Sequence, residues 1–390
     1  MDLLLLAQDV TWGGRTGDAV HLRELARQLV RRGHRVRIIA RAGLSSDDDS
    51  TEALRIYPLR STFNLAFSVV RRPYVMRTLL RAVSDRRPDL LYSRGCGDLA
   101  EALAARTLGL PIVFEVNGDL IAERESQLGR GLSGPAKAWM VGTSRRGFRI
   151  ARSVVAVTET LRQRLSDDFD VPADKVLVIP NAADTDLFHP IPIARAREEL
   201  GIPVGTPVVL FVGNLAPWQG VEYLVSALAE VLRSRPGALL LVVGDGQEGP
   251  ALRALAAKLG VQDHVRFMGA VPHEQVPGCI AAADVCVAPL TQERLRSGSS
   301  ALKIHEYLAC ERPVVASRIP GLEFLEFEAL GKLVPPEDPH ALAAALVAAL
   351  ADEGWCRSAG SRGRAYVLKN AGWPAVAARV EDALQRAVAS

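Results

Sequence analysis

The sequence lacks the features that mark secreted, zinc-binding and membrane-spanning proteins. Its 390 residues include five cysteines, an odd number, and no CxxC pair. We therefore expect neither a disulfide framework nor a zinc site. No apolar run approaches the roughly 18 residues of a membrane-spanning helix. The short apolar run at residues 1–7 also lacks the basic flank of a signal peptide. Together these absences favour a protein of the reducing cytoplasm.

Aromatic residues and net charge are low as well. Aromatics make up 5% of the chain, so its cores must be built from Ala, Val and Leu. A formal net charge of +3 is too small to indicate a nucleic-acid partner. The charge is uneven, with 28 Lys and Arg against 23 Asp and Glu in residues 1–190. This basic half either faces an anionic acceptor or a membrane surface, or reflects an arginine-rich proteome.

The chain does contain a regular alternation of short apolar runs and amphipathic stretches. Runs typical of buried parallel strands lie at residues 3–7, 36–40, 90–92, 112–116, 154–157, 176–179, 208–212, 239–243, 265–268, 285–288 and 313–316. Helical patterns separate many of them, as at residues 18–30 and 221–232. The alternation predicts the α/β class, with helices on both faces of parallel sheets.

A break in the alternation predicts two Rossmann-like domains. Residues 187–206 hold Pro190, Pro192 and Pro203, a composition typical of a linker. We therefore place a first domain at residues 1–187 and a second at 188–372. The final helix, 373–390, either ends the second domain or crosses back to the first.

Ligands of such folds bind at the carboxyl ends of the strands, and the segment from Ser297 to Ala309 has the richest pattern there. Small residues run into a helix, whose bare N–H groups form an anion site. Lys303 and Glu306 then share a helix face. A phosphate would bind the loop and Lys303, and Glu306 would accept hydrogen bonds from sugar hydroxyls. The alternative is an ordinary capped helix with a solvated Lys–Glu pair.

The loop after the first strand argues against a dinucleotide enzyme. Residues 13–17 do not form GxGxxG, and Arg41 stands where an acidic residue would hold a ribose. Phosphate could approach the amides of Gly13 and Gly14. A tight strand-to-helix turn is the alternative.

Five segments in order resemble glycosyltransferase family 4, and the resemblance covers almost the whole chain. They are residues 13–36, 179–188, 211–215, 243–246 and 303–316. The resemblance implies a GT-B fold, in which two Rossmann-like domains face each other across a cleft. It implies a first domain that binds an acceptor with a hydroxyl group. The second domain would bind a nucleotide-diphosphate sugar, with retaining transfer, no metal and no other cofactor.

The resemblance also assigns roles to individual residues. Glu306 would hold the nucleotide ribose, while Gly14 and the loop 298–300 would bind phosphate and donor sugar. Asn117 ends a strand near the place where many relatives have a histidine, and Asp119 follows it. His273 would line the base pocket. The catalytic candidates are Lys303, Glu306 and Asn117. The substrate-binding candidates are Gly13, Gly14, Asp119, Gly213, Asn214, Gln219, Gly244, Val271, His273, Arg294, Arg296, Gly298, Ser299, Ser300, Ala301 and Leu302.

Three departures from the family pattern affect the diphosphate and sugar contacts. Asn214 and Gln219 stand where many members have Arg and Lys, so two positive charges are missing. Arg294, Arg296 and Lys303 are the candidates to replace that charge. Gly298 occupies the position of the first glutamate in the family's paired motif. These changes leave open a degenerate scaffold or activator without catalysis, and a sugar-nucleotide epimerase is a further alternative.

A basic run at residues 71–87 alternates arginine with apolar residues, which is typical of an amphipathic helix. It is either an ordinary surface helix of the first domain or a dock for a lipid-linked acceptor at the inner membrane face.

Overall fold

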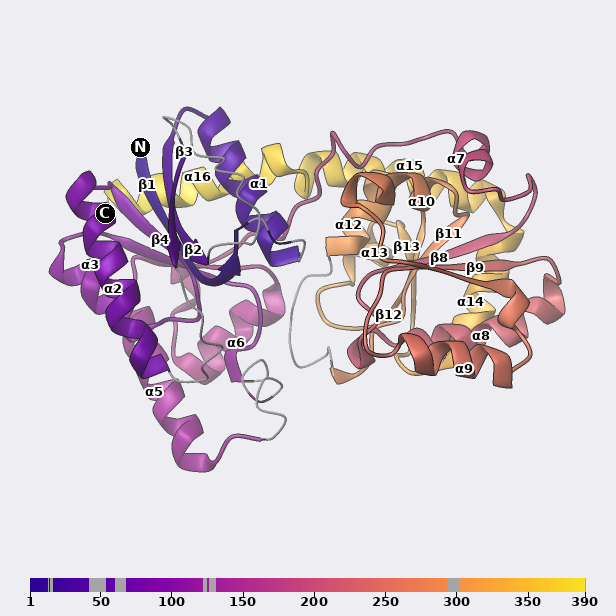
Figure 1. The fold of residues 1–390 in the computed structure, drawn as a ribbon, viewed down its shortest axis with the longest axis horizontal. Coiled ribbons are helices and arrows are strands. Elements are labelled where there is room, and N and C mark those ends of the chain that lie inside the picture. Colours follow the sequence, from indigo (N-terminus) through magenta and orange to yellow (C-terminus); the bar gives the residue numbers. More distant parts are fainter. Residues whose placement is uncertain are drawn as a thin grey trace. The chain divides into compact units, whose positions relative to one another are not determined.

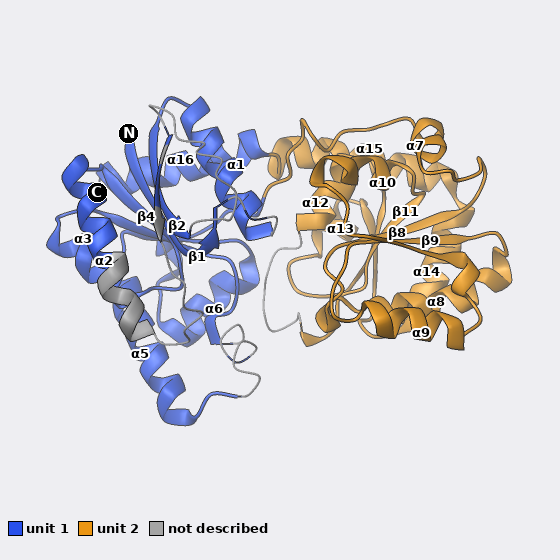
Figure 2. Cartoon of the chain, in the orientation of Figure 1, with its two compact units in different colours: residues 1–181, 297–300, 373–390 blue, residues 182–296, 301–372 orange. Residues whose placement is uncertain are grey.

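A computed structural model describes residues 1–12, 14, 17–41, 54–59, 68–121, 125, 131–293 and 302–389. The chain forms two compact units, one within residues 1–181 and 373–390, the other within 182–296 and 301–372 (Figure 2). The division falls between Asn181 and Ala182, a few residues before the position expected from sequence.

The first unit is built on a seven-stranded parallel sheet with the order β3-β2-β1-β4-β5-β6-β7 (Figure 1). The strands are β1 (Asp2–Thr11), β2 (Arg35–Arg41), β3 (Leu54–Leu59), β4 (Leu90–Arg94), β5 (Ile112–Val116), β6 (Ser153–Ala156) and β7 (Val176–Val178). The helices are α1 (Gly17–Arg31), α2 (Ser68–Asp85), α3 (Leu99–Thr107), α5 (Gly134–Ile150), α6 (Glu159–Phe169) and α16 (Trp373–Ala389).

The helices of the first unit cover both faces of this sheet. Residues of α2, α3, α5 and α6 share one apolar core with alternate strand residues such as Leu91 and Phe114. Tyr92 and Glu115 point to the opposite face, where α1 lies. The final helix α16 packs on α1, β4 and β5 and belongs to this unit.

The second unit is built on a six-stranded parallel sheet with the order β10-β9-β8-β11-β12-β13. The strands are β8 (Val208–Val212), β9 (Leu239–Val243), β10 (Val265–Gly269), β11 (Val285–Ala288), β12 (Val314–Ser317) and β13 (Gly331–Val334). The helices are α7 (Ile193–Glu199), α8 (Val221–Ser234), α9 (Gly249–Lys258), α10 (Val276–Ala281), α12 (Leu302–Ala309), α13 (Phe324–Phe327), α14 (Pro339–Ala351) and α15 (Glu353–Asn370). An apolar core lies on each face of the sheet.

The linker predicted at residues 187–206 is wrong. This segment carries α7, and Phe188, Ala196 and Ile202 are buried in a core of the second unit. Its prolines end and begin short elements within a folded domain, because Pro192 directly precedes the first turn of α7.

The sequence patterns also missed β3, β13 and α15. β3 contains Pro58, and α15 contains three glycines, which weaken the strand and helix signals. Two of these glycines have a packing reason. A Cβ at Gly360 would lie 2.2 Å from the Glu311 carbonyl oxygen, and one at Gly363 would lie 2.6 Å from the Leu308 side chain. Glycine therefore allows α15 to lie close against α12.

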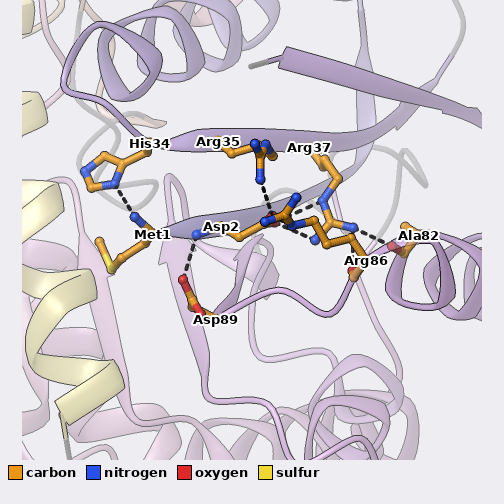
Figure 3. A network of polar contacts seen from close by, with 8 residues as sticks. All are labelled: Met1, Asp2, His34, Arg35, Arg37, Ala82, Arg86 and Asp89. Carbon is orange, nitrogen blue, oxygen red and sulfur yellow. Dashed lines mark hydrogen bonds and ion pairs between the residues drawn. The ribbon is translucent and has the colours of Figure 1, made fainter. Parts of the chain in front are cut away.

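A polar network ties the amino ends of β1 and β2 to the end of α2 (Figure 3). The Asp2 carboxylate accepts from Arg37 Nε at 3.1 Å and pairs with Arg86 Nε at 2.9 Å. Arg37 Nη1 also donates to the carbonyl oxygen of Arg86 at 2.6 Å. The Asp2 backbone N–H donates to the Asp89 carboxylate at 2.7 Å. These contacts lie at the amino ends of the strands, opposite to their carboxyl ends.

Of the helices that the structure describes, none has the length and apolar composition needed to cross a bilayer.

Candidate functional site

Two glycine turns lie together at the carboxyl ends of neighbouring strands in the second unit. Gly213 follows β8 and Gly244 follows β9, with φ of 147° and 126°. The Gly213 N–H donates to the Val243 carbonyl at 2.9 Å. A Cβ at Gly244 would lie 2.0 Å from the Gly213 carbonyl oxygen. Only glycine permits this approach, so the backbones of the two turns pack directly against each other beside the strand ends.

The Lys303 ammonium group lies beside the Gly213 turn. Its Nζ donates to Gln219 Oε1 at 2.7 Å and lies 4.1 Å from the centroid of the Phe211 ring. A Cβ at Gly213 would stand 2.7 Å from the same Nζ atom. The structure therefore brings Lys303 together with two residues predicted from a different segment, Gly213 and Gln219. A lysine at position 219 would place a second ammonium group beside the first.

Glu306 lies one helical turn after Lys303 on α12. Burial raises the pKa of its carboxyl to about 7, although the positive charge of Lys303 acts in the opposite direction. Tyr307 fixes the helix to the sheet, because its fully buried hydroxyl accepts from the Val212 N–H at 2.8 Å. His305 is buried and its ring lies 5.8 Å from that of Phe324, so it packs in the core.

The remaining described candidates of the second unit are Asn214, His273, Val271 and Leu302, and the first three contact other residues of that unit. Asn214 turns its side-chain oxygen toward Gly246, where a Cβ would lie 2.5 Å from it. His273 follows β10 and packs its ring against Phe188, with 5.2 Å between ring centroids. Val271 is partly buried against the core, and the partly buried Leu302 begins α12.

The first unit holds a buried ionic cluster at the carboxyl ends of β4 and β5. Glu115 is 3% exposed and lies 2.9 Å from His21 Nε2 and 3.6 Å from Arg94 Nε. It also accepts hydrogen bonds from the Tyr92 hydroxyl and from Asn117 Nδ2, the latter at 2.6 Å. Burial raises the pKa of Glu115, but His21, Arg94 and Tyr92 outweigh burial and leave it lowered. Burial also raises the pKa of Tyr92 well above its ordinary value.

This cluster orients Asn117. Because the ionised Glu115 can only accept, it takes the Asn117 amide NH₂ as its donor. The Asn117 Oδ1 atom is buried and finds no hydrogen-bond partner among the described residues. Asn117 thus offers a hydrogen-bond acceptor at the end of β5.

The two other described candidates of the first unit have structural partners. Asp119 forms an ion pair with Arg164 and accepts from the Ile121 N–H at 2.8 Å. The Gly14 N–H donates to the Thr11 carbonyl at 3.0 Å. That bond closes a turn between β1 and α1, which agrees with the tight strand-to-helix turn that the sequence offered as the alternative to phosphate binding.

Comparison with known proteins identifies the family. The family model described as Glycosyltransferase Family 4 matches residues 16–187, and the one described as Glycosyl transferases group 1 matches residues 206–352. The chain is 31% identical over 374 residues to the D-inositol 3-phosphate glycosyltransferase of Segniliparus rotundus, covering 90% of this chain and 81% of that protein. The chain belongs to glycosyltransferase family 4.

Solved structures confirm the GT-B fold expected from the resemblance. Sucrose-phosphate synthase from Thermosynechococcus elongatus superposes with a TM-score of 0.81 at 23% identity, over 100% of this chain and 99% of that one. Anabaena HepE in complex with UDP-glucose gives 0.76 at 21% identity, over 99% and 100%. Family membership confirms that the protein is a glycosyltransferase.

Several predicted site residues of this glycosyltransferase lie outside the described residues. They are Gly13, Arg294, Arg296, Gly298, Ser299, Ser300 and Ala301. Within the described ranges, no group of three or more His, Cys, Asp or Glu residues is arranged to hold a metal ion.

Sequence reasoning missed His21, Tyr92, Arg94 and Phe211. One signal lay in β4, because Tyr92 and Arg94 are polar residues in the second half of a strand that begins with two leucines. Phe211 and His21 lie within the segments 211–215 and 13–36 that resemble the family, but neither was proposed as a site residue; an aromatic residue such as Phe211 in a buried strand is normally assigned to the core.

Proposed function

We propose that this glycosyltransferase moves a sugar from a nucleotide-diphosphate sugar to an acceptor hydroxyl, with retention of configuration and without a metal ion. The observation that carries the proposal is the Lys303 ammonium group, which Gln219 holds beside the Gly213 turn. The complex of Anabaena HepE with UDP-glucose supports a donor of this class.

Lys303 would neutralise the departing diphosphate. Charge grows on the leaving group as the bond between the anomeric carbon and the diphosphate oxygen breaks. A lysine that donates to Gln219 and lies over the Phe211 ring needs little rearrangement to meet that charge. Because Gln219 is neutral, it neither offsets the charge of Lys303 nor adds a second positive charge at that position.

Glu306 would bind the nucleotide ribose. It follows Lys303 on the same face of α12, so a ribose hydroxyl can reach it while the diphosphate meets Lys303. An ionised carboxylate accepts from two hydroxyls, whereas a protonated carboxyl accepts less well. Ribose binding should therefore favour the ionised form.

Asn117 would accept a hydrogen bond from a substrate hydroxyl through its Oδ1 atom. Asn117 cannot act as a base, and front-face retaining transfer does not require one. The acceptor oxygen bonds to the anomeric carbon, the bond to the diphosphate breaks, and the acceptor proton passes to the departing diphosphate oxygen. Each atom is then accounted for without a protein base.

The first experiment is a thermal-shift screen with UDP-, GDP- and dTDP-sugars. A donor should stabilise the protein and should stabilise the Lys303→Met variant less. The donor so identified is then incubated with candidate acceptors, and NMR of the product reports the anomeric configuration. An inverted product would overturn the retaining assignment, and the absence of stabilisation by every nucleotide sugar would overturn the donor class.

A further inference from the structure

Glu337 has a backbone conformation that residues other than glycine rarely adopt. It lies between β13 and α14 with a φ of 61°, in the left-handed region that favours glycine. Among the described residues other than glycine, Asp170, Glu311 and Ala329 share a positive φ. A strained residue persists only where surrounding contacts maintain it, and such residues cluster at functional sites. The contacts of Glu337 therefore bear on its role.

A hydrogen bond of the Glu337 carboxylate reaches across the sheet. Its Oε1 atom accepts from the Gln292 N–H at 2.9 Å. Gln292 follows β11 and Glu337 follows β13, while β12 lies between these two strands. We call residues 289–292 the β11 segment. The bond therefore ties the chain after β13 to the β11 segment, at the carboxyl ends of the strands.

Glu337 makes this bond in spite of other carboxylates nearby. Burial raises the pKa of the Glu222 carboxyl, and the negative charges of Glu248 and Glu337 raise it further. Like charges repel, so Glu337 adds an electrostatic cost to that of its strained backbone. A glycine at position 337 would avoid both costs but could not accept from the Gln292 N–H. That hydrogen bond is what a glutamate supplies here and a glycine cannot.

The β11 segment packs directly on residues 217–220, which we call the β8 turn. The Thr291 N–H donates to the Trp218 carbonyl oxygen at 3.2 Å. A Cβ at Gly220 would lie 1.9 Å from the Pro289 carbonyl oxygen, so the two backbones touch. Thr291 is buried, and no side chain separates the two backbones at Gly220. A displacement of the β11 segment would therefore move the β8 turn with it.

The β8 turn carries Gln219, whose side-chain oxygen accepts from Lys303 Nζ at 2.7 Å. We infer that Glu337 is a positioning residue for Lys303, acting through the β11 segment and the β8 turn. The inference rests on the proposed role of Lys303 at the diphosphate. Glu337 itself binds no substrate in this arrangement. It fixes where Gln219 presents its oxygen, and thereby where the ammonium group meets the leaving group.

The test compares two replacements of Glu337 in the full chain by steady-state kinetics. Glu337→Gly removes the acceptor and relieves the strain, whereas Glu337→Gln keeps an oxygen that can accept from the Gln292 N–H. A hydrogen bond to a charged acceptor, realised fully at the transition state, corresponds to roughly 10- to 150-fold in rate. Because the effect passes through two segments, kcat should fall about tenfold in Glu337→Gly, with little change in KM. Glu337→Gln should stay within about twofold of the unmodified protein.

Asp170→Gly is the matched control. Asp170 is an acidic residue with a φ of 54° in the first unit, and its carboxylate pairs with Arg145. This variant also relieves strain and removes a carboxylate, yet it should leave kcat unchanged. In Glu337→Gly, relief of strain and of charge repulsion offsets the lost hydrogen bond, so the melting temperature should change little. A residue that served only stability would lower melting temperature and activity together.

Two further measurements test the route of the effect. In a double-mutant cycle, Glu337→Gly should lower kcat by less than about twofold in the Lys303→Met background, because coupled residues are not additive. Hydrogen exchange gives a readout that needs no substrate. Glu337→Gly should speed exchange at the amides of Thr291 and Gln292 and at those of the β8 turn.

Four results would overturn the inference. They are an unchanged kcat in Glu337→Gly, equal effects of that variant in both backgrounds, unchanged exchange in the β8 turn, and a loss in Glu337→Gln as large as that in Glu337→Gly. The last would show that charge acts, and not the hydrogen bond. Absence of turnover by the unmodified protein with every nucleotide sugar would instead refute the proposed function. Hydrogen exchange would still decide whether Glu337 holds the β8 turn.

Discussion

Replacing Lys303 by Met tests whether one lysine supplies the positive charge at the diphosphate. Methionine keeps much of the side-chain volume and can still pack on the Phe211 ring, so the fold should persist. The change removes the ammonium group that donates to Gln219 at 2.7 Å. A charged hydrogen bond contributes about 2–3 kcal/mol at most, which corresponds to roughly 30- to 150-fold in rate.

The loss should appear mainly in kcat. Negative charge on the diphosphate grows toward the transition state, so Lys303 should stabilise that state more than the bound donor. Steady-state kinetics with the donor found in the thermal-shift screen measure both constants. A variant with near wild-type kcat would refute the role of Lys303. Arg294 and Arg296 would then be the next candidates for the missing charge, to be tested as Arg294→Gln and Arg296→Gln.

A gain-of-charge variant examines the same argument from the other side. In Gln219→Lys, two ammonium groups about 4 Å apart would repel by about 4 kcal/mol at an effective dielectric of 20. The unliganded variant should therefore melt at a lower temperature and regain stability with a nucleoside diphosphate. Gln219→Met is the matched control, since it loses the hydrogen bond without adding charge. Equal melting temperatures for the two variants would contradict the proximity of Lys303.

The remaining predictions concern the ribose contact, metal dependence and the glycine turns. Glu306→Ala should weaken donor binding in calorimetry without unfolding the protein, and unchanged affinity would remove Glu306 from the ribose site. Since the pKa of Glu306 is raised from 4.5 to about 7, the carboxylate forms as pH rises through 7. Donor affinity should therefore increase from pH 6 to pH 8, and Glu306→Gln should abolish that increase. The same shift favours folding below pH 4.5 and loses this contribution as pH rises through 7. EDTA should leave turnover unchanged, and loss of activity restored by Mg²⁺ would contradict the metal-free proposal. Gly244→Ala should cost about 2–4 kcal/mol of unfolding free energy because of strain and backbone overlap. Gly237→Ala, where a Cβ would meet nothing within 4 Å, should be nearly neutral in the same denaturant titration.

Local patterns were sufficient for much of the fold. β5, β8, β9 and β11 coincide with their predicted ranges, because short apolar runs between turn residues have few other solutions in an α/β chain. The prediction of a linker at residues 187–206 was wrong, since proline content does not reveal whether the flanking apolar residues are buried. Phe188, Ala196 and Ile202 enter a core whose other members are distant in sequence.

The sequence by itself determined the identity and order of the motifs that carry Gly213, Gly244, Lys303 and Glu306. The requirement for glycine at a tight turn and the periodicity of a helix are local properties, so they can be recognised in a single sequence. Only the tertiary structure decided which side chains meet. Lys303 and Gln219 are separated by 84 positions and are joined because β8 and β11 are neighbouring strands.

The orientation of Asn117 was decided in the same way. Glu115 takes its amide, and His21 and Tyr92 keep that carboxylate ionised from a helix and a strand elsewhere in the sequence. The partners of a buried polar group depend on packing across elements, and packing is a property of the whole sheet. A motif can therefore indicate where a ligand binds, while the charge and hydrogen-bonding direction of each group follow from the folded chain.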